Sequence, residues 1–437
     1  MSGSVEYATL RPECDEEGPS PPLCIVLHGG GGNREALAGQ QGRDRALWGD
    51  SWLPARHGCQ DGDASVDLRD AARADSGPRP RKRSALLAVL PERLEFTRPD
   101  DWHLHLRDGA MLERVVGATA RVFARAIVMP NLDPSVTTTA LAEVYAERIA
   151  AAAPPDAHFT PLMTLYLTSE TTPAEIARAA ASPSVFAVKL YPKGATTNSE
   201  AGVDGLDGLA PVLEAMERHD VPLLVHGEST APGDDVFDRE RVFLEDTLAP
   251  LVDRHAGLRV VFEHITTAEA AAFVAEAPPR VGATLTPQHL LLNRNALFEG
   301  GLRPHHYCLP VLKRESDREA LVAAATSGNP SFFLGTDSAP HARELKEAAC
   351  GCAGIYSAPV AIESYAEVFA EAGALERLEG FASHHGPDFY RLPRNEERIV
   401  LAREDWVGPA SEGEGSGGVE VFWSGRTFRY RFDGLVR

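Results

Sequence analysis

The 437-residue sequence is poor in cysteine, with only six in the whole chain. Cys350 and Cys352 are separated by one residue and Cys308 lies well upstream, so the C-x2-C pairs typical of structural zinc sites are missing. So few cysteines at such spacings do not indicate a disulfide framework. We therefore expect reduced thiols.

Long apolar runs and net positive charge are missing as well. The longest apolar run near the N-terminus, residues 23–27, is too short for a signal-peptide core or a membrane span. The formal net charge of −20 disfavours binding to the phosphate backbone of nucleic acids. We expect a cytoplasmic protein that binds neither membranes nor nucleic acid.

Residues 1–92 lack the apolar periodicity that marks helices and strands, and residues 76–83 are typical of a basic linker. One apolar segment, residues 23–28, precedes four glycines and Asn33 and resembles the oxyanion-hole segment of α/β-hydrolase esterases. The G-x-S-x-G nucleophile motif of those esterases occurs nowhere in the chain, which argues against a serine esterase. We expect residues 1–92 to be a loosely ordered extension or a fusion remnant.

From Leu94 onward, strand-like apolar segments alternate with helical segments rich in Ala, Glu and Arg. Eight such units predict a parallel α/β sheet closed into a (β/α)8 TIM barrel, although a doubly wound open sheet shares the alternation. The predicted strands are 101–107, 126–131, 159–167, 185–191, 222–228, 258–265, 281–287 and 331–337, and the predicted helices include 137–152, 173–181, 206–219, 238–253, 267–276, 315–326, 344–349 and 360–372.

The chain is thus predicted to contain an extension over residues 1–92, a barrel over residues 93–400 and a C-terminal tail over residues 401–437. Residues 412–418 of the tail are rich in Gly and Ser and predict a loop. The alternating segment that follows, centred on Ser424 and Gly425, predicts a small hairpin.

Polar side chains stand at or near the C-terminal end of five predicted strands. In a (β/α)8 barrel these strand ends share one rim, and active sites are built on that rim. We therefore predict that residues distant in the sequence converge there on one site. They are His103, His105, Lys189, His226, His264 and Asp337.

Each of these residues also has a simpler structural explanation. His103 and His105 point to the same face of a strand, but such a pair is at least as often a surface or core feature. Lys189 could be an ion-paired lysine, or a buried lysine of low pKa that reacts with CO2 and bridges two metals. His226 and His264 could be hydrogen-bonded core histidines. Their joint placement favours a binuclear zinc centre, because imidazole and carboxylate are standard zinc ligands and two metals activate a bridging water.

The sequence resembles the amidohydrolase superfamily, and within it the bacterial dihydroorotases of the homodimeric class. The similarity runs from about residue 94 to about residue 395 and leaves out residues 1–92. The segments that carry it are DDWHLHLRDG (100–109), AIVMPNL (126–132), KLYPKGATTNS (189–199), LLVHGE (223–228), VFEHITT (261–267), TLTPQHL (284–290), YCLPVLKR (307–314) and GTDSAPHA (335–342).

The resemblance implies two Zn2+ per subunit, bridged by Lys189 as N6-carboxylysine and by a hydroxide. His103 and His105 would hold the more buried zinc, His226 and His264 the second, and Asp337 would ligate the first and act as the catalytic acid and base. The implied substrate-binding residues are His105, Arg107, Asn131, His226, Leu309, His341 and Ala353, and Thr196 and Thr197 would lie in a loop that closes over the substrate.

The implied reaction is the reversible cyclisation of N-carbamoyl-L-aspartate to (S)-dihydroorotate in pyrimidine biosynthesis, in a homodimer. A ring carboxylate distinguishes this substrate from those of hydantoinases and dihydropyrimidinases. Arg107 lies on the strand face of His105 and can meet a carboxylate with paired hydrogen bonds, whereas the simpler alternative is a surface salt bridge. Another cyclic amidohydrolase and a non-catalytic scaffold remain the alternatives.

Overall fold

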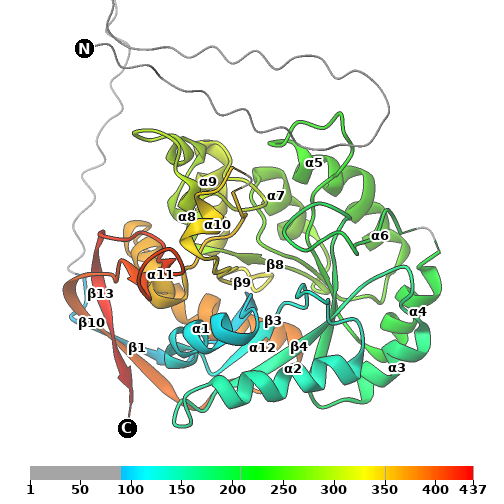
Figure 1. Ribbon diagram of the computed structural model, residues 1–437, viewed down its shortest axis with the longest axis horizontal. Coiled ribbons are helices and arrows are strands. Elements are labelled where there is room, and N and C mark those ends of the chain that lie inside the picture. Colours follow the sequence, from blue (N-terminus) through cyan, green and yellow to red (C-terminus); the bar gives the residue numbers. More distant parts are fainter. Residues whose placement is uncertain (1–89, 207, 350, 437) are drawn as a thin grey trace, which may run out of the picture. The chain divides into compact units, whose positions relative to one another are not determined.

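The computed structural model describes residues 90–436 except residues 207 and 350. Eight parallel strands form one sheet in chain order, as predicted (Figure 1). They are β2 (Asp101–Leu104), β3 (Arg125–Val128), β4 (Thr160–Tyr166), β5 (Val185–Leu190), β6 (Leu223–Val225), β7 (Val260–Phe262), β8 (Val281–Leu285) and β9 (Phe332–Leu334).

The first and last strands join just beyond β9 and close the barrel. Asp337 N donates to His103 O at 2.8 Å, and His105 N donates to Ser338 O at 2.9 Å. The (β/α)8 barrel is therefore confirmed, and the open doubly wound sheet is wrong. Two of the predicted metal ligands and the predicted acid-base residue thus lie at the seam of the barrel.

Helices surround the strands in Figure 1 and bury the apolar outer face of the barrel. The helix predicted over residues 238–253 is confirmed, and it contains a π-helical turn at Leu244–Leu248. The helices are α1 (Gly109–Val122), α2 (Thr139–Ala152), α3 (Pro173–Ala181), α4 (Ala210–His219), α5 (Arg239–Phe243), α6 (Ala249–Arg254), α7 (Ala268–Glu276), α8 (Pro287–Leu291), α9 (Glu315–Ala325), α10 (Arg343–Lys346), α11 (Ala361–Glu371) and α12 (His385–Tyr390).

A separate apolar layer fills the interior of the barrel beneath the predicted site. Alternate residues of the strands point inward, as the period-two geometry of a strand requires. Tyr390 of α12 stacks on the indole of Trp102 with a centroid separation of 4.5 Å. A side chain at Gly386 would collide with the same indole, so α12 can approach only because this residue is glycine. The layer comprises Trp102, Ile127, Met129, Leu162, Ala187, Leu224, Val261, Phe333 and Tyr390.

The C-terminal tail forms a sheet with a strand that the sequence interpretation missed. β1 (Arg93–Thr97) and β13 (Thr427–Leu435) both pair antiparallel with β10 (Arg398–Val407). The hairpin predicted around Ser424 and Gly425 is therefore wrong, because β12 (Val419–Glu420) pairs with β11 (Ser411–Glu412) and not with β13. Alternating apolar residues indicate a strand, but they do not specify its partner.

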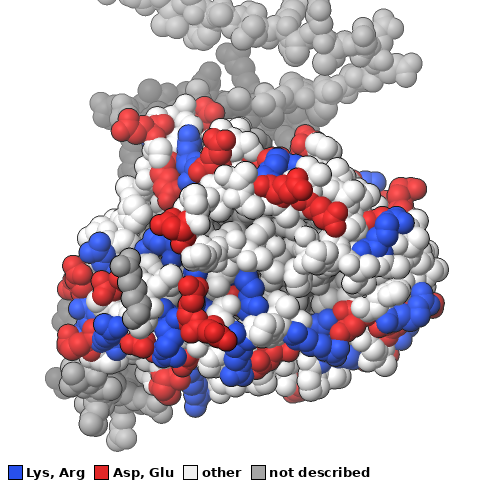
Figure 2. Space-filling view, turned by 90° about the horizontal axis from the view of Figure 1, so that it is seen from below, with Lys and Arg blue, Asp and Glu red and all other residues white. Residues whose placement is uncertain are grey.

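Nearly all of the predicted extension, including residues 23–28, Asn33 and the linker at 76–83, lies outside the described residues. In the part of the chain that the structure describes, no helix is long and apolar enough to cross a bilayer. Figure 2 shows one face of the molecule, on which acidic and basic side chains are interspersed around an uncharged centre.

Candidate active site and metal centre

The carboxyl ends of the strands surround a pocket of about 330 Å³. Lys189 and His341 adjoin this pocket without lining it: the Lys189 Nζ lies 4.8 Å from the ring centre of Tyr191, which does line it. The structure therefore brings the predicted site residues together. Those that line the pocket are His103, His105, Arg107, Asn131, Thr196, Thr197, His226, His264, Leu309, Asp337 and Ala353.

The predicted metal ligands form one continuous cluster. His103 and His105 each place Nε2 3.3 Å from Oδ1 of Asp337, and one ligand atom from each of the three lies within 4.8 Å of the others. The ring centroid of His264 lies 4.9 Å from the ring centroid of His103 and 4.8 Å from the ring centroid of His226. Because these donors are the types that zinc binds, the residues fit a metal centre.

Lys189 and Glu263 form a fully buried ion pair directly beside this cluster. Burial lowers the pKa of Lys189, although the charge of Glu263 opposes the shift. Glu263 Oε1 also lies 3.0 Å from Nδ1 of His103. The sequence interpretation missed Glu263, although a charged residue between the buried strand β7 and His264 was the available signal.

A second carboxylate orients His226. Glu228 Oε2 lies 2.8 Å from Nε2 of His226, and both side chains are buried. A histidine that ligates a metal commonly uses its other nitrogen in this way, which fixes the ring and its tautomer. The contact leaves Nδ1 of His226 as the nitrogen available to a metal. The sequence analysis did not predict Glu228 as a site residue either.

Asp101 links the first and last strands under the site. Its Oδ1 accepts hydrogen bonds from the backbone N of His103 at 3.2 Å and of Thr336 at 2.9 Å, and its Oδ2 accepts from Thr336 Oγ1 at 2.6 Å. Burial raises the pKa of Asp101 to about 6, although these hydrogen bonds oppose the shift. Asp101 therefore holds the two segments that carry His103 and Asp337.

Three of the predicted site residues adopt left-handed backbone conformations. The φ angles are 59° for Arg107, 43° for His264 and 45° for Asp337. Such conformations are costly for residues with a side chain and concentrate at functional sites, where the surrounding structure enforces them. At Asp337 the hydrogen bond of the barrel seam supplies this constraint.

The protonation states of the site depend on burial and on close partners. Burial alone would raise the pKa of Asp337, but hydrogen bonds from His103 and His105 hold it well below its usual value. Burial lowers the pKa of His105 to about 4 despite its contact with Asp337. Asp337 is therefore an ionised carboxylate that can bind a cation.

A cationic group contacts one of the predicted metal ligands: Arg107 Nη1 lies 3.4 Å from Nδ1 of His105. Arg107 places Nη2 3.0 Å from Nε2 of His341 and donates from Nε to Pro340 O at 3.1 Å. Burial, followed by the charge of Arg107, lowers the pKa of His341 to about 2, so this imidazole is neutral. Among the described residues, no carboxylate pairs with Arg107. The partly buried guanidinium is thus able to receive an anion.

The loop that contains Thr196 and Thr197 lines the pocket and contacts two other lining residues, Asn131 and Ala353. Asn131 Nδ2 donates to Thr197 O at 3.0 Å, and Asn198 Nδ2 donates back to Asn131 O at 3.0 Å. Thr197 Oγ1 also donates to Ala353 O at 3.4 Å. Gly194, in the same loop, has a φ of +74°, which favours glycine.

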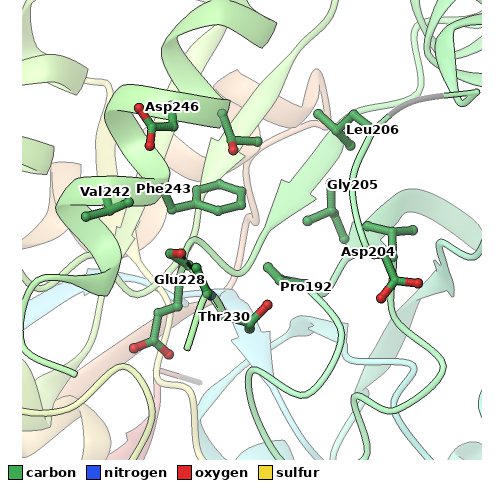
Figure 3. Close-up of a pocket in the computed structure, with 14 residues that line it drawn as sticks. Pro192, Asp204, Gly205, Leu206, Glu228, Thr230, Val242, Phe243 and Asp246 are labelled. Carbon is green, nitrogen blue, oxygen red and sulfur yellow. Dashed lines mark hydrogen bonds between the residues drawn. The ribbon is translucent and has the colours of Figure 1, made fainter. Parts of the chain in front are cut away.

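A larger hollow of about 790 Å³ lies nearby (Figure 3). It is lined by Pro192, Leu206, Glu228 and Phe243 among others, and Glu228 is the residue that contacts His226. None of the six predicted metal ligands lines it. The chemistry therefore belongs to the smaller pocket.

The Amidohydrolase family model matches residues 101–399. Over 318 residues the chain is 65% identical to a protein from Methylobacillus flagellatus named dihydroorotase, and the match covers 73% of this chain and 92% of that protein. The chain belongs to the dihydroorotases of the amidohydrolase family. It is therefore an enzyme of the class that acts on cyclic amide bonds.

Solved structures of dihydroorotases share this fold. A Saccharomyces cerevisiae dihydroorotase in complex with 5-fluoroorotic acid is 33% identical, with a TM-score of 0.73, and the match covers 79% of this chain and all of that one. A Campylobacter jejuni dihydroorotase is 34% identical, with a TM-score of 0.72, and the match covers 78% of this chain and 97% of that one. The similarity to the dihydroorotase family thus extends through the whole barrel.

Proposed function

We propose that this dihydroorotase interconverts N-carbamoyl-L-aspartate and (S)-dihydroorotate with zinc as its cofactor. The observation that carries the proposal is the cluster of metal-ligand types that shares a single pocket with the partly buried guanidinium of Arg107. A pocket of this kind suits a cyclic amide that bears a carboxylate, and uncharged rings would leave Arg107 without a partner.

The metal side of the proposal assigns two Zn2+ per subunit to His103, His105, Lys189, His226, His264 and Asp337. When bound, the ions would activate water near neutral pH and polarise the amide carbonyl. Lys189 would serve as a carboxylated lysine, since its lowered pKa increases the fraction of neutral amine that can react with CO2. Carboxylation would replace its present ion pair with Glu263.

The residues around the substrate have distinct roles in the proposal. Arg107, Asn131 and His341 bind the ring carboxylate, and backbone groups at Leu309 and Ala353 contact the ring amide. In the hydrolytic direction Asp337 accepts a proton from the attacking water and delivers it to the leaving ring nitrogen, so that the C–N bond breaks and N-carbamoyl-L-aspartate forms.

The loop over the pocket acts in this proposal as a lid. Thr196 and Thr197 would cover the substrate and exclude water while the ring opens. Opening requires the contacts of this loop with Asn131 and Ala353 to break, and these are only a few hydrogen bonds. We further propose that the protein is a cytoplasmic homodimer and that residues 1–92 are an extension or fusion remnant ahead of the barrel at 93–400.

Ring opening by the purified, zinc-loaded full chain tests the proposal. We expect turnover of dihydroorotate, followed by loss of its ultraviolet absorbance, and no turnover of dihydrouracil or hydantoin. Chelation should abolish activity, and added zinc with bicarbonate should restore it. Turnover of the uncharged rings alone would overturn the carboxylate assignment, and no turnover by the fully metallated protein would favour the scaffold alternative.

A further inference from the structure

A buried lysine outside the metal centre connects two loops of the pocket. Lys346, the last residue of α10, is 3% exposed. Its Nζ donates hydrogen bonds to Tyr307 O at 2.8 Å, to Cys352 O at 2.8 Å and to Gly354 O at 2.7 Å. An ammonium group has three N–H donors, so each of them has a backbone acceptor.

The three carbonyls flank backbone that lines the pocket. Ala353 lies between Cys352 and Gly354, and its own carbonyl oxygen is 3.0 Å from Nε2 of His341. Leu309 lies two residues after Tyr307, whose carbonyl also accepts from Gly354 N at 3.0 Å. Lys346 thus joins both segments at the wall where the guanidinium of Arg107 lies.

We propose that Lys346 is a positioning residue for substrate binding. By donating a hydrogen bond to each of the three carbonyls, its ammonium group fixes the backbone on both sides of Ala353. This orients the carbonyl of Ala353, which contacts His341. This inference rests on the proposed function, because it assigns the fixed backbone to dihydroorotate. Lys346 does not line the pocket, so it acts through its neighbours.

Burying an ammonium group is costly, and an apolar side chain could fill the same space, but it would leave the three carbonyls without a donor. Burial lowers the pKa of Lys346 to about 8, with Cys308 and Cys352 opposing the shift and Arg107 adding to it. The cation therefore adds to the positive potential of the wall that would face the substrate anion.

Lys346→Met in the zinc-loaded full chain tests this role. We expect KM for dihydroorotate and the dissociation constant for 5-fluoroorotate to rise roughly tenfold or more, with a smaller change in kcat, because three carbonyls lose their donor. Lys313→Met is the matched control, since its buried ammonium donates to Val311 O at 3.0 Å and contacts none of the three carbonyls. The control should keep KM within about twofold of the wild type. Unchanged KM and dissociation constant in Lys346→Met would overturn the inference.

A second measurement covers the case in which Lys346→Met does not fold. In the wild type, KM should rise as the pH increases through about 8, where the ammonium loses its proton. Lys346→Arg, whose charge persists, should lack this rise. A wild-type KM that stays flat from pH 7 to pH 10 would also overturn the inference. Failure of the wild type to open dihydroorotate would instead overturn the proposed function.

Discussion

The two sides of the pocket are built in different ways. The metal side, defined here as His103, His105, His264 and Asp337, stands at strand ends. The hydrogen bonds of the barrel seam hold three of these residues, and the backbone N of His264 donates to Thr284 Oγ1 at 2.7 Å. The anion side, defined as Arg107, Asn131, His341 and Ala353, is held by contacts between loops. Side chains at strand ends are held in place by the hydrogen bonds of the sheet. Side chains on loops need additional contacts between the loops to hold them in place.

Loss of the proton acceptor on the metal side should have the largest effect. We expect Asp337→Asn to reduce kcat by about 10²- to 10⁴-fold, because the amide cannot accept and deliver the proton. Zinc content, measured by atomic absorption, should fall only in part, since the histidines remain. Activity near that of the wild type would exclude Asp337 as the acid and base.

On the anion side, the expected change is in binding and not in chemistry. Arg107→Met should raise KM for dihydroorotate by roughly 10- to 100-fold, because hydrogen bonds to a charged group are worth about 1.5–3 kcal/mol. Steady-state kinetics on the zinc-loaded variant separate KM from kcat. Arg394→Met, which removes an exposed partner of Asp388, serves as the control and should leave KM unchanged. An unchanged KM in Arg107→Met would remove this residue from the carboxylate site.

The rigidity of the metal side can be tested through Asp101. Asp101→Ala leaves the buried backbone N–H groups of His103 and Thr336 without an acceptor, which should lower the free energy of unfolding by about 3 kcal/mol. Denaturant unfolding of the metal-free protein measures this change. The comparison variant is Asp388→Ala, which breaks an exposed ion pair and should cost about 1 kcal/mol or less. Equal losses in the two variants would contradict the role assigned to Asp101.

The smallest effect is expected from the lid. Asn198→Ala removes one hydrogen bond to Asn131 O and should change kcat/KM by roughly two- to tenfold. Hydrogen exchange of residues 193–202 should become faster in this variant, while exchange in β2 and β9 stays the same. Faster exchange in the strands as well would mean that the lid and the barrel seam are coupled.

The barrel could be predicted from the sequence because each of its strands is marked by an apolar run of neighbouring residues. All eight strands were found, since parallel strands covered by helices have continuous apolar runs. The polar residues that end those runs marked the rim, and the structure places all of the predicted ligands at or beside one pocket.

The residues that escaped prediction act through partners distant in the sequence. Glu263, Glu228 and Asp101 each have a role only because a histidine or another strand lies beside them in space. β1 was missed for a similar reason, since it is stabilised by pairing with β10 more than 300 residues away, as the 303-residue separation of Glu95 and Arg398 shows. Local periodicity carries no information about such pairing.

The closure of the barrel at His103 and Asp337 has a consequence for synthesis of the chain. The hydrogen-bonded pair Asp101 and Thr336 is 235 residues apart, so a nascent chain must emerge through residue 336 before the two can meet. Until then His103 and His105 lack the carboxylate that faces them, and metal binding is weak because the ligands are not preassembled. For the proposed metal centre, we therefore expect metal capture to follow closure of the seam.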